Sequence, residues 1–144
     1  MKIKDFMTSN VATCSPEASL ADCAQLMKEN DCGMIPIIET NGSRNAVGVL
    51  TDRDITLRTL GEGINPMDCK VSDIMTNDPV TIAANASHEE AEELMESHQI
   101  RRLLVIDEDG NCCGILAQAD LARNVSSKEV GEVVQNISAS PQTF

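Results

Sequence analysis

The sequence predicts an α/β protein built from two copies of one β-α-β-β-α repeat. Two recurring motifs indicate this: Lys2–Thr8 (KIKDFMT) returns as Lys70–Thr76 (KVSDIMT), and Gly48–Ile55 (GVLTDRDI) returns as Gly114–Leu121 (GILAQADL). Between these motifs, apolar runs of strand length alternate with segments that have the apolar spacing of a helix. Motifs that recur in the same order determine the architecture before any single residue is interpreted.

Composition and charge restrict the function. The 144 residues are 42% hydrophobic but include only two phenylalanines and neither tryptophan nor tyrosine, so the core must be aliphatic. The net charge of −12, with 11 Lys and Arg against 23 Asp and Glu, disfavours binding to nucleic-acid phosphates. The sequence shows neither a signal-peptide pattern nor an apolar stretch long enough for a membrane span. We therefore expect a cytoplasmic protein that binds neither nucleic acid nor membrane.

Local patterns predict the elements of the first repeat. Ser19 is placed as a helix N-cap, with Asp22 at the third helical position in a variant of the capping box. Short apolar runs indicate buried strands, and glycines mark helix ends. The expected elements are a strand at Val11–Thr13, a helix from Leu20 that stops near Gly33, strands at Met34–Ile38 and Ala46–Leu50 joined by a turn at Asn41-Gly42, and a helix from Asp52 to Leu60 that Gly61 ends.

The second repeat has the same order of elements. Ser87 and Glu90 form a capping box, and Asp109-Gly110 is typical of a hairpin turn. The expected elements are a strand at Pro79–Ile82, a helix that follows Ser87, strands at Leu103–Ile106 and Cys112–Leu116, and a helix at Gln118–Asn124.

These elements predict the division of the chain. We expect the first repeat at residues 1–60, a linker at 61–69, the second repeat at 70–125 and a C-terminal tail at 126–144, in which Lys128–Asn136 has the pattern of a short helix.

The ordered motifs resemble the CBS domain (cystathionine β-synthase domain), present as the tandem pair called a Bateman module. The resemblance rests on the K-h-x-D-h-M-T opening, the capped helix that ends in Leu-Met, the Asp-Glu-Asp-Gly turn and the G-h-h-T-x-x-D motif, and it covers Lys2 to Val125. Thr51–Ile55 and His98–Arg102 are also similar to small stand-alone bacterial CBS-pair proteins, the hypoxic response type among them.

This resemblance implies both a fold and a function. The two repeats are expected to pack sheet to sheet about a pseudo-twofold axis and to leave two clefts, which in this family commonly hold AMP, ADP, ATP or S-adenosylmethionine. Two such modules often pair into a homodimer. The implied function is a non-catalytic regulatory module that binds an adenosine nucleotide and relays energy status to a partner protein by a conformational or oligomeric change.

The residues of the G-h-h-T-x-x-D motif suit such a ligand. Thr51 ends a predicted strand and Asp54 lies in the first turn of the next predicted helix, where unpaired backbone N–H groups would favour a phosphate. The Asp54 carboxylate can accept two hydrogen bonds from a ribose diol. The alternative is that Thr51 and Asp54 only cap the helix, although a cap needs only one of them.

For the stronger of the two expected sites, further residues are chosen because they are positively charged or because the resemblance implies them. Arg53 and the pair Arg101 and Arg102 are candidates for phosphate contacts, the alternative being that they are solvated surface arginines. The resemblance places the adenine slot of this site at Thr76 and Val80.

The second site is expected to be weaker. Asp120 keeps the ribose-type carboxylate, but Ala117 stands where the motif has threonine, and a lost hydroxyl contact costs about 0.5–1.5 kcal/mol. The resemblance adds to this site Thr8, Val11, Thr13, Met34 and Ile35.

No catalytic constellation is recognisable around His88 or His98, so we expect no enzyme, no catalytic residue and no resident metal or cofactor. Two alternatives to a nucleotide-binding module stay open. One is a metal or redox sensor built from the six cysteines, alone or together with His88 or His98, and the other is a scaffold dimer indifferent to nucleotides. The sequence selects neither one nucleotide nor a regulated partner.

Overall fold

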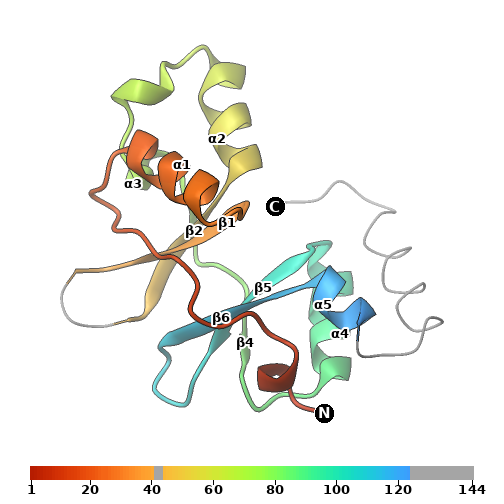
Figure 1. Cartoon of the computed structure of the whole chain (residues 1–144). Coiled ribbons are helices and arrows are strands. Elements are labelled where there is room, and N and C mark those ends of the chain that lie inside the picture. Colours follow the sequence, from red (N-terminus) through yellow and green to blue (C-terminus); the bar gives the residue numbers. More distant parts are fainter. Residues whose placement is uncertain (41–43, 124–144) are drawn as a thin grey trace. The chain divides into compact units, whose positions relative to one another are not determined.

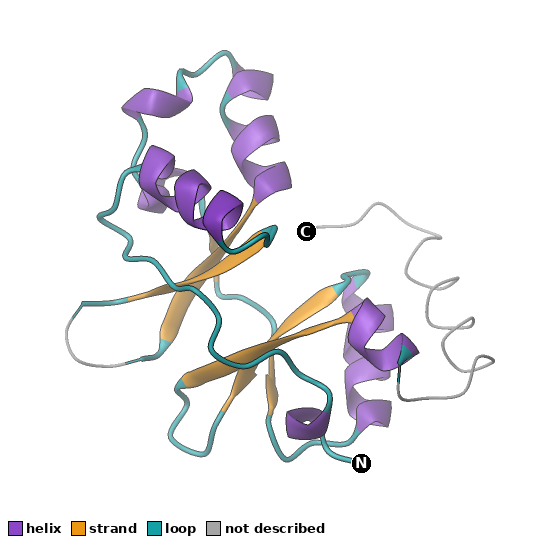
Figure 2. Cartoon of the chain, viewed as in Figure 1, coloured by secondary structure: helices purple, strands orange, loops and turns teal. Residues whose placement is uncertain are grey.

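The computed structural model describes residues 1–40 and 44–123, and its contacts divide the chain into two compact units (Figures 1 and 2). The Asp54 unit consists of Val11–Pro79. The Asp120 unit consists of Met1–Asn10 together with the chain from Val80 onward. The predicted turn at Asn41-Gly42, the predicted helix at 128–136 and the predicted tail lie outside the described residues.

In the Asp54 unit, helices pack against one sheet with the strand order β1-β2-β3, in which both neighbouring pairs are antiparallel (Figure 2). Cys14 adds an isolated parallel bridge to Ile37 at the outer edge of β1. The elements are α1 (Leu20–Glu29), β1 (Met34–Ile38), β2 (Ala46–Thr51), α2 (Asp52–Arg58), the 3-10 helices η2 (Leu60–Glu62) and η3 (Pro66–Asp68), α3 (Val71–Ile74) and β3 (Thr76–Asn77).

The Asp120 unit repeats this plan. Its sheet has the order β4-β5-β6, with β4 parallel and β6 antiparallel to β5, and Thr8 forms an antiparallel bridge to Ile115. The elements are the 3-10 helix η1 (Ile3–Asp5), β4 (Thr81–Ala83), α4 (His88–His98), β5 (Arg102–Ile106), β6 (Cys112–Ala117) and α5 (Gln118–Ala122). The predicted α/β class is confirmed.

The opening heptapeptide of each sequence repeat packs in the unit that holds the core of the other repeat. Thr76, from the second opening, pairs with Val49 of β2. Thr8, from the first opening, pairs with Ile115 of β6. Each compact unit therefore combines the core of one sequence repeat with the opening heptapeptide of the other. The repeat boundaries mark where the sequence pattern recurs, and they are not the boundaries of the compact units.

Two glycines make this packing possible. A Cβ atom on Gly48 would lie 2.7 Å from Met75 Sδ and 2.9 Å from the Thr76 carbonyl oxygen. A Cβ atom on Gly114 would lie 2.7 Å from both Met7 Sδ and the Thr8 carbonyl oxygen. The Met-Thr pair that ends each opening heptapeptide packs directly against the glycine of the G-h-h-T-x-x-D motif, in which h is a hydrophobic residue. This contact explains why the two motifs recur together.

Most of the predicted strands and caps are confirmed. The Ser19 hydroxyl accepts the Asp22 N–H at 3.1 Å, and the Ser87 hydroxyl accepts the Glu90 N–H at 3.3 Å. Both N-caps are thus confirmed, but the Asp22 and Glu90 side chains return no bond to the cap residues, so the predicted capping boxes are only half formed. Gly110 adopts a left-handed φ of 82° in the predicted hairpin turn. The four predicted inner strands correspond to β1, β2, β5 and β6, and alternating burial in β6 separates Cys112 from Cys113.

Several predicted boundaries were wrong. Val11–Thr13 is not a strand, and α1 ends at Glu29 because the chain reverses at Asp31, with a φ of 49°, before Gly33 is reached. α2 ends at Arg58 rather than Leu60, since Thr59 leaves the helical region and its hydroxyl donates to the Ile55 carbonyl. The predicted linker contains the ordered segment η3.

The core is aliphatic, as the composition predicts. Fully buried side chains include Leu20, Ile35 and Leu50 in the Asp54 unit, and Leu103 and Leu116 in the Asp120 unit. In residues 1–40 and 44–123, no helix combines the length and the apolarity that a membrane crossing needs.

We predict that Gly48→Ala destabilises the protein by about 1–3 kcal/mol, because the new methyl group overlaps Met75 and a backbone oxygen that cannot swing away. Gly61→Ala is the matched control, since its Cβ would meet only the Thr56 carbonyl at 3.7 Å. Urea unfolding of both variants measures the difference. Equal stability of the two variants would contradict the close packing of the heptapeptide.

Candidate functional site

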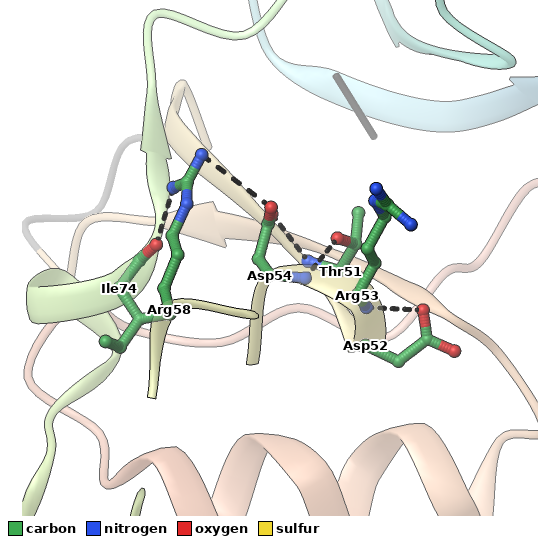
Figure 3. Close-up of polar contacts among 6 residues, drawn as sticks. All are labelled: Thr51, Asp52, Arg53, Asp54, Arg58 and Ile74. Carbon is green, nitrogen blue, oxygen red and sulfur yellow. Dashed lines mark hydrogen bonds and ion pairs between the residues drawn. The ribbon is translucent and has the colours of Figure 1, made fainter. Parts of the chain in front are cut away.

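The candidate site is built where β2 passes into α2 (Figure 3). The Asp54 N–H donates to Thr51 Oγ1 at 3.1 Å, and the Thr51 N–H donates to Asp54 Oδ2 at 3.3 Å. This reciprocal capping box satisfies two backbone donors and fixes both side chains. Thr51 is 1% exposed and Asp54 is 4% exposed, so the pair lies under the surface of the Asp54 unit.

Two interpretations from the sequence need correction here. A cap was expected to need only one of the two residues, but the structure uses both. The start of α2 was also expected to offer unpaired N–H groups to a phosphate. The Asp52 N–H donates to the Gly33 carbonyl at 3.0 Å, the Arg53 N–H donates to Asp52 Oδ1 at 2.8 Å, and the Asp54 N–H is held by Thr51. These donors are occupied within the unit, so a phosphate would depend on side chains.

The second carboxylate oxygen of Asp54 faces Arg58 (Figure 3). Arg58 Nη2 lies 3.7 Å from Asp54 Oδ1, which is an ion pair too long for a hydrogen bond. Arg58 Nη1 donates to the Ile74 carbonyl at 2.8 Å. Oδ2 is therefore committed to the cap, while Oδ1 keeps capacity to accept hydrogen bonds.

Arg58 and the Ile74 carbonyl were missed by the sequence interpretation. The Asp54–Arg58 spacing of four residues is a signal that could have identified the arginine, since such side chains are neighbours on a helix. The carbonyl had no signal, because it lies in a heptapeptide that the repeat pattern assigns to the other half of the chain.

Met34, which was expected at the weaker site, pairs directly with Thr51 in the sheet. Thr76 is a further predicted site residue that the structure brings to this region. It pairs with Val49, two residues before Thr51 in β2, so the side chains of Thr76 and Thr51 emerge on the same face of the sheet. Within residues 1–40 and 44–123, Thr76 Oγ1 is one of the buried polar atoms without a hydrogen-bond partner. A hydroxyl of this kind is suited to a ligand or an ordered water.

Arg53 lies on the exposed face of α2, and its guanidinium extends away from Arg58 (Figure 3). An open pocket of about 360 Å³ on this face is lined by Asp52, Arg53, Thr56 and Leu57. Thr51 and Asp54 do not line this pocket, because they belong to the buried side of the helix start.

The Asp120 unit has a partial version of the same site. Asp120 is 4% exposed, its Oδ2 accepts the Ala117 N–H at 2.7 Å, and Arg123 forms an ion pair with its Oδ1. Ala117 has no hydroxyl to return a hydrogen bond to the Asp120 N–H, so the cap runs in one direction only. The predicted asymmetry between the two motifs is therefore present in their local structure.

The other predicted site residues are divided between the units. Arg101 is exposed and its carbonyl accepts the Gln118 N–H at 2.8 Å, while Arg102 is half-buried at the start of β5. The Asp120 unit holds Thr8, Val80, Arg101 and Arg102, and the Asp54 unit holds Val11, Thr13, Met34 and Ile35.

The cysteines are all thiols, and three of them gather in the Asp54 unit. Cys23 is fully buried in the core of that unit, and Cys14 and Cys32 pack against it. Burial and the neighbouring Cys14 thiol raise the pKa of Cys23 to about 12. Within the described ranges, no group of three or more His, Cys, Asp or Glu side chains is arranged to hold a metal ion.

Comparison with known proteins shows the relatives of the chain. The model of the CBS domain family matches residues 3–60 and 71–127. The CBS domain-containing protein YhcV of Bacillus subtilis is 42% identical over 137 residues, which are 94% of each chain. Hypoxic response protein 1 of Mycobacterium tuberculosis is 33% identical over 134 residues, which are 93% of this chain and 92% of that protein.

Two solved structures are also similar. Hypoxic Response Protein I with two coordinated zinc ions has a TM-score of 0.76 and 33% identity, and the match covers 88% of this chain and 100% of that one. CBSX2 in complex with AMP has a TM-score of 0.70 and 31% identity, and the match covers 85% and 93%.

We predict opposite effects from exchanging the motif residues of the two units. Thr51→Val removes the cap acceptor and is expected to cost about 0.5–2 kcal/mol, while Thr51→Ser retains the hydroxyl and most of the stability. Ala117→Thr introduces an N-cap hydroxyl of the kind that Thr51 provides and is expected to stabilise by a few tenths to about 1 kcal/mol. Urea unfolding measures all three, and an unchanged Thr51→Val variant would contradict the capping role.

We predict that Cys23 is the slowest of the six thiols to alkylate in the folded protein. Because its pKa is about 12, the thiol form predominates below that pH, and at pH 8 only about one molecule in ten thousand carries the reactive thiolate. Mass spectrometry after iodoacetamide treatment can resolve Cys14 from Cys23, since cleavage at Glu17 separates them. Rapid labelling of Cys23 at pH 8 would show that the cluster opens readily.

Proposed function

Because the chain belongs to the CBS-domain family, we propose that it is a non-catalytic regulatory module that binds an adenosine nucleotide at Asp54. The candidate ligands are AMP, ADP, ATP and S-adenosylmethionine. All four contain a ribose with a vicinal diol, so recognition of the ribose by Asp54 does not distinguish among them.

The observation that carries this proposal is the state of the Asp54 carboxylate. It is 4% exposed and held in place through Oδ2, while Oδ1 has only the 3.7 Å ion pair to Arg58. Oδ1 therefore keeps capacity to accept hydrogen bonds from a ligand, and ribose hydroxyls are donors that can use it. Each such bond to a charged acceptor contributes about 1.5–3 kcal/mol.

Further features support the same ligand class. The unpartnered Thr76 hydroxyl lies on the same face of the sheet as Thr51 and can contact the nucleotide. Arg53 is an exposed cation in an acidic protein and is the candidate in this unit for a phosphate contact. Val80, Arg101 and Arg102 stay in the proposal as residues predicted from the sequence. The similar protein CBSX2 is an AMP complex.

The Asp120 motif is proposed as the weaker site, because Ala117 offers no hydroxyl. The relay of ligand binding to a partner protein and the formation of a homodimer also remain proposals that follow from the family. A metal or redox sensor is the alternative. The zinc ions of Hypoxic Response Protein I favour the metal version, and the three neighbouring cysteines of the Asp54 unit favour the redox version.

We predict that adenosine nucleotides stabilise the protein against heat. A nucleotide at one hundred times its Kd adds about 2.7 kcal/mol, which thermal unfolding detects readily. Asp54→Ala should abolish this stabilisation, and Asp120→Ala should reduce it less. Asp22→Ala is the matched control, because it removes a carboxylate from the same helical position in α1, away from the site.

Binding is measured directly by titration calorimetry with each of the four nucleotides, on protein freed of carried-over ligand. No binding by any of them would overturn the proposal and leave a scaffold that recognises only protein. Stoichiometric zinc in protein purified without chelator, together with protection of Cys14 and Cys32 from alkylation, would favour the metal alternative.

A further inference from the structure

We infer that Arg58 couples the Asp54 carboxylate to helix α3, so that a ligand bound at Asp54 alters the order of the α3 segment. The guanidinium lies between the Asp54 carboxylate and the Ile74 carbonyl, with Nη2 3.7 Å from the former and Nη1 2.8 Å from the latter (Figure 3). One planar group therefore contacts both the proposed ligand-binding residue and a segment 16 residues away in the sequence.

The α3 end of this bridge depends on Arg58. α3 has only four residues, and a helix of one turn has little stability of its own. Ile74 is its last residue, so the Ile74 carbonyl has no acceptor role within the helix. The amides of Val71 and Ser72 bond to the Ala18 and Pro16 carbonyls, which ties α3 to the segment before α1. At the other end of α3, the Arg58 guanidinium of α2 donates to the Ile74 carbonyl and so ties α3 to α2.

The contact between Arg58 and Asp54 is the one that a ligand would replace. Arg58 is 44% exposed and its ion pair with Asp54 is long, and exposed ion pairs of this kind contribute little to stability. Ribose hydroxyls that donate to Oδ1 compete with Arg58 for the same oxygen. The guanidinium then loses the contact with Asp54 that orients it, and its bond to the Ile74 carbonyl is weakened.

The position of α3 gives this coupling a consequence. Met75 and Thr76 follow Ile74 directly and form the close contact with Gly48. The Asp54 unit ends at Pro79, five residues after Ile74. A ligand-dependent change in α3 would therefore act on the last segment of this unit before the chain enters the other one.

The test is hydrogen exchange of a peptide that covers Val71–Met75, first without nucleotide. Arg58→Met should raise exchange of these amides about three- to tenfold, in line with the net loss of one hydrogen bond from a half-exposed side chain. Asp54→Asn, which keeps an acceptor for the Thr51 N–H, should also raise exchange in the wild-type background but add nothing in the Arg58→Met background. Lys28→Met, a loss of the same charge at the end of α1, should leave α3 unchanged.

The second arm adds AMP and rests on the proposed function. AMP should change α3 exchange in the wild type and not in Arg58→Met, while the affinity of Arg58→Met for AMP stays equal or rises, because a competitor has been removed. If Arg58→Met unfolds, Arg58→Lys replaces it in both arms, since one ammonium cannot hold both partners in the fork that a guanidinium provides.

Additive effects of Asp54→Asn and Arg58→Met on α3 exchange would overturn the inference. So would a loss of AMP binding in a folded Arg58→Met protein, which would make the arginine a direct ligand contact. If wild-type protein binds no nucleotide, the proposed function fails, but the double-mutant cycle without nucleotide still decides whether Arg58 couples Asp54 to α3.

Discussion

The packing of each opening heptapeptide on a strand glycine is the constraint on which the candidate site depends. In the Asp54 unit, Met75 and the Thr76 carbonyl press against Gly48, where no larger residue fits. That contact positions the Ile74 carbonyl within 2.8 Å of Arg58 and pairs Thr76 with Val49 on β2. The polar surroundings of Asp54 therefore include the Ile74 carbonyl and Thr76 from a segment that lies far away in the sequence, and these two groups are present only while the heptapeptide stays in place.

This exchange of segments also explains what the sequence could and could not predict. Inner strands, the Ser19 and Ser87 caps and the hairpin turn at Gly110 depend on neighbours in the chain, and these were predicted correctly. Which unit receives a given heptapeptide depends on long-range packing. Both openings end in Met-Thr and both strands carry the glycine, so the local pattern is the same whichever pairing occurs.

The candidate site was predicted in composition but not in detail. Thr51 and Asp54 lie together as expected, yet they hold each other in a reciprocal cap. The helix-start donors expected to bind phosphate are occupied, because Asp52 turns its carboxylate back on the Arg53 N–H and the Gly33 carbonyl takes the Asp52 N–H. Side-chain orientation decides such hydrogen bonds, and residue spacing alone does not contain it.

The two oxygens of Asp54 divide structural and exchangeable roles. Oδ2 accepts the Thr51 N–H, which fixes the orientation of the carboxylate. Oδ1 faces a half-exposed arginine at 3.7 Å, a weak interaction that leaves this oxygen able to accept other donors. The same arginine donates to the Ile74 carbonyl, so in the proposed coupling a loss of the Oδ1 contact weakens that bond and is felt by α3. The proposed coupling needs one fixed and one exchangeable contact on the same carboxylate. If both oxygens were fixed, the carboxylate could not respond to a ligand. If neither were fixed, the carboxylate could not be positioned to bind one.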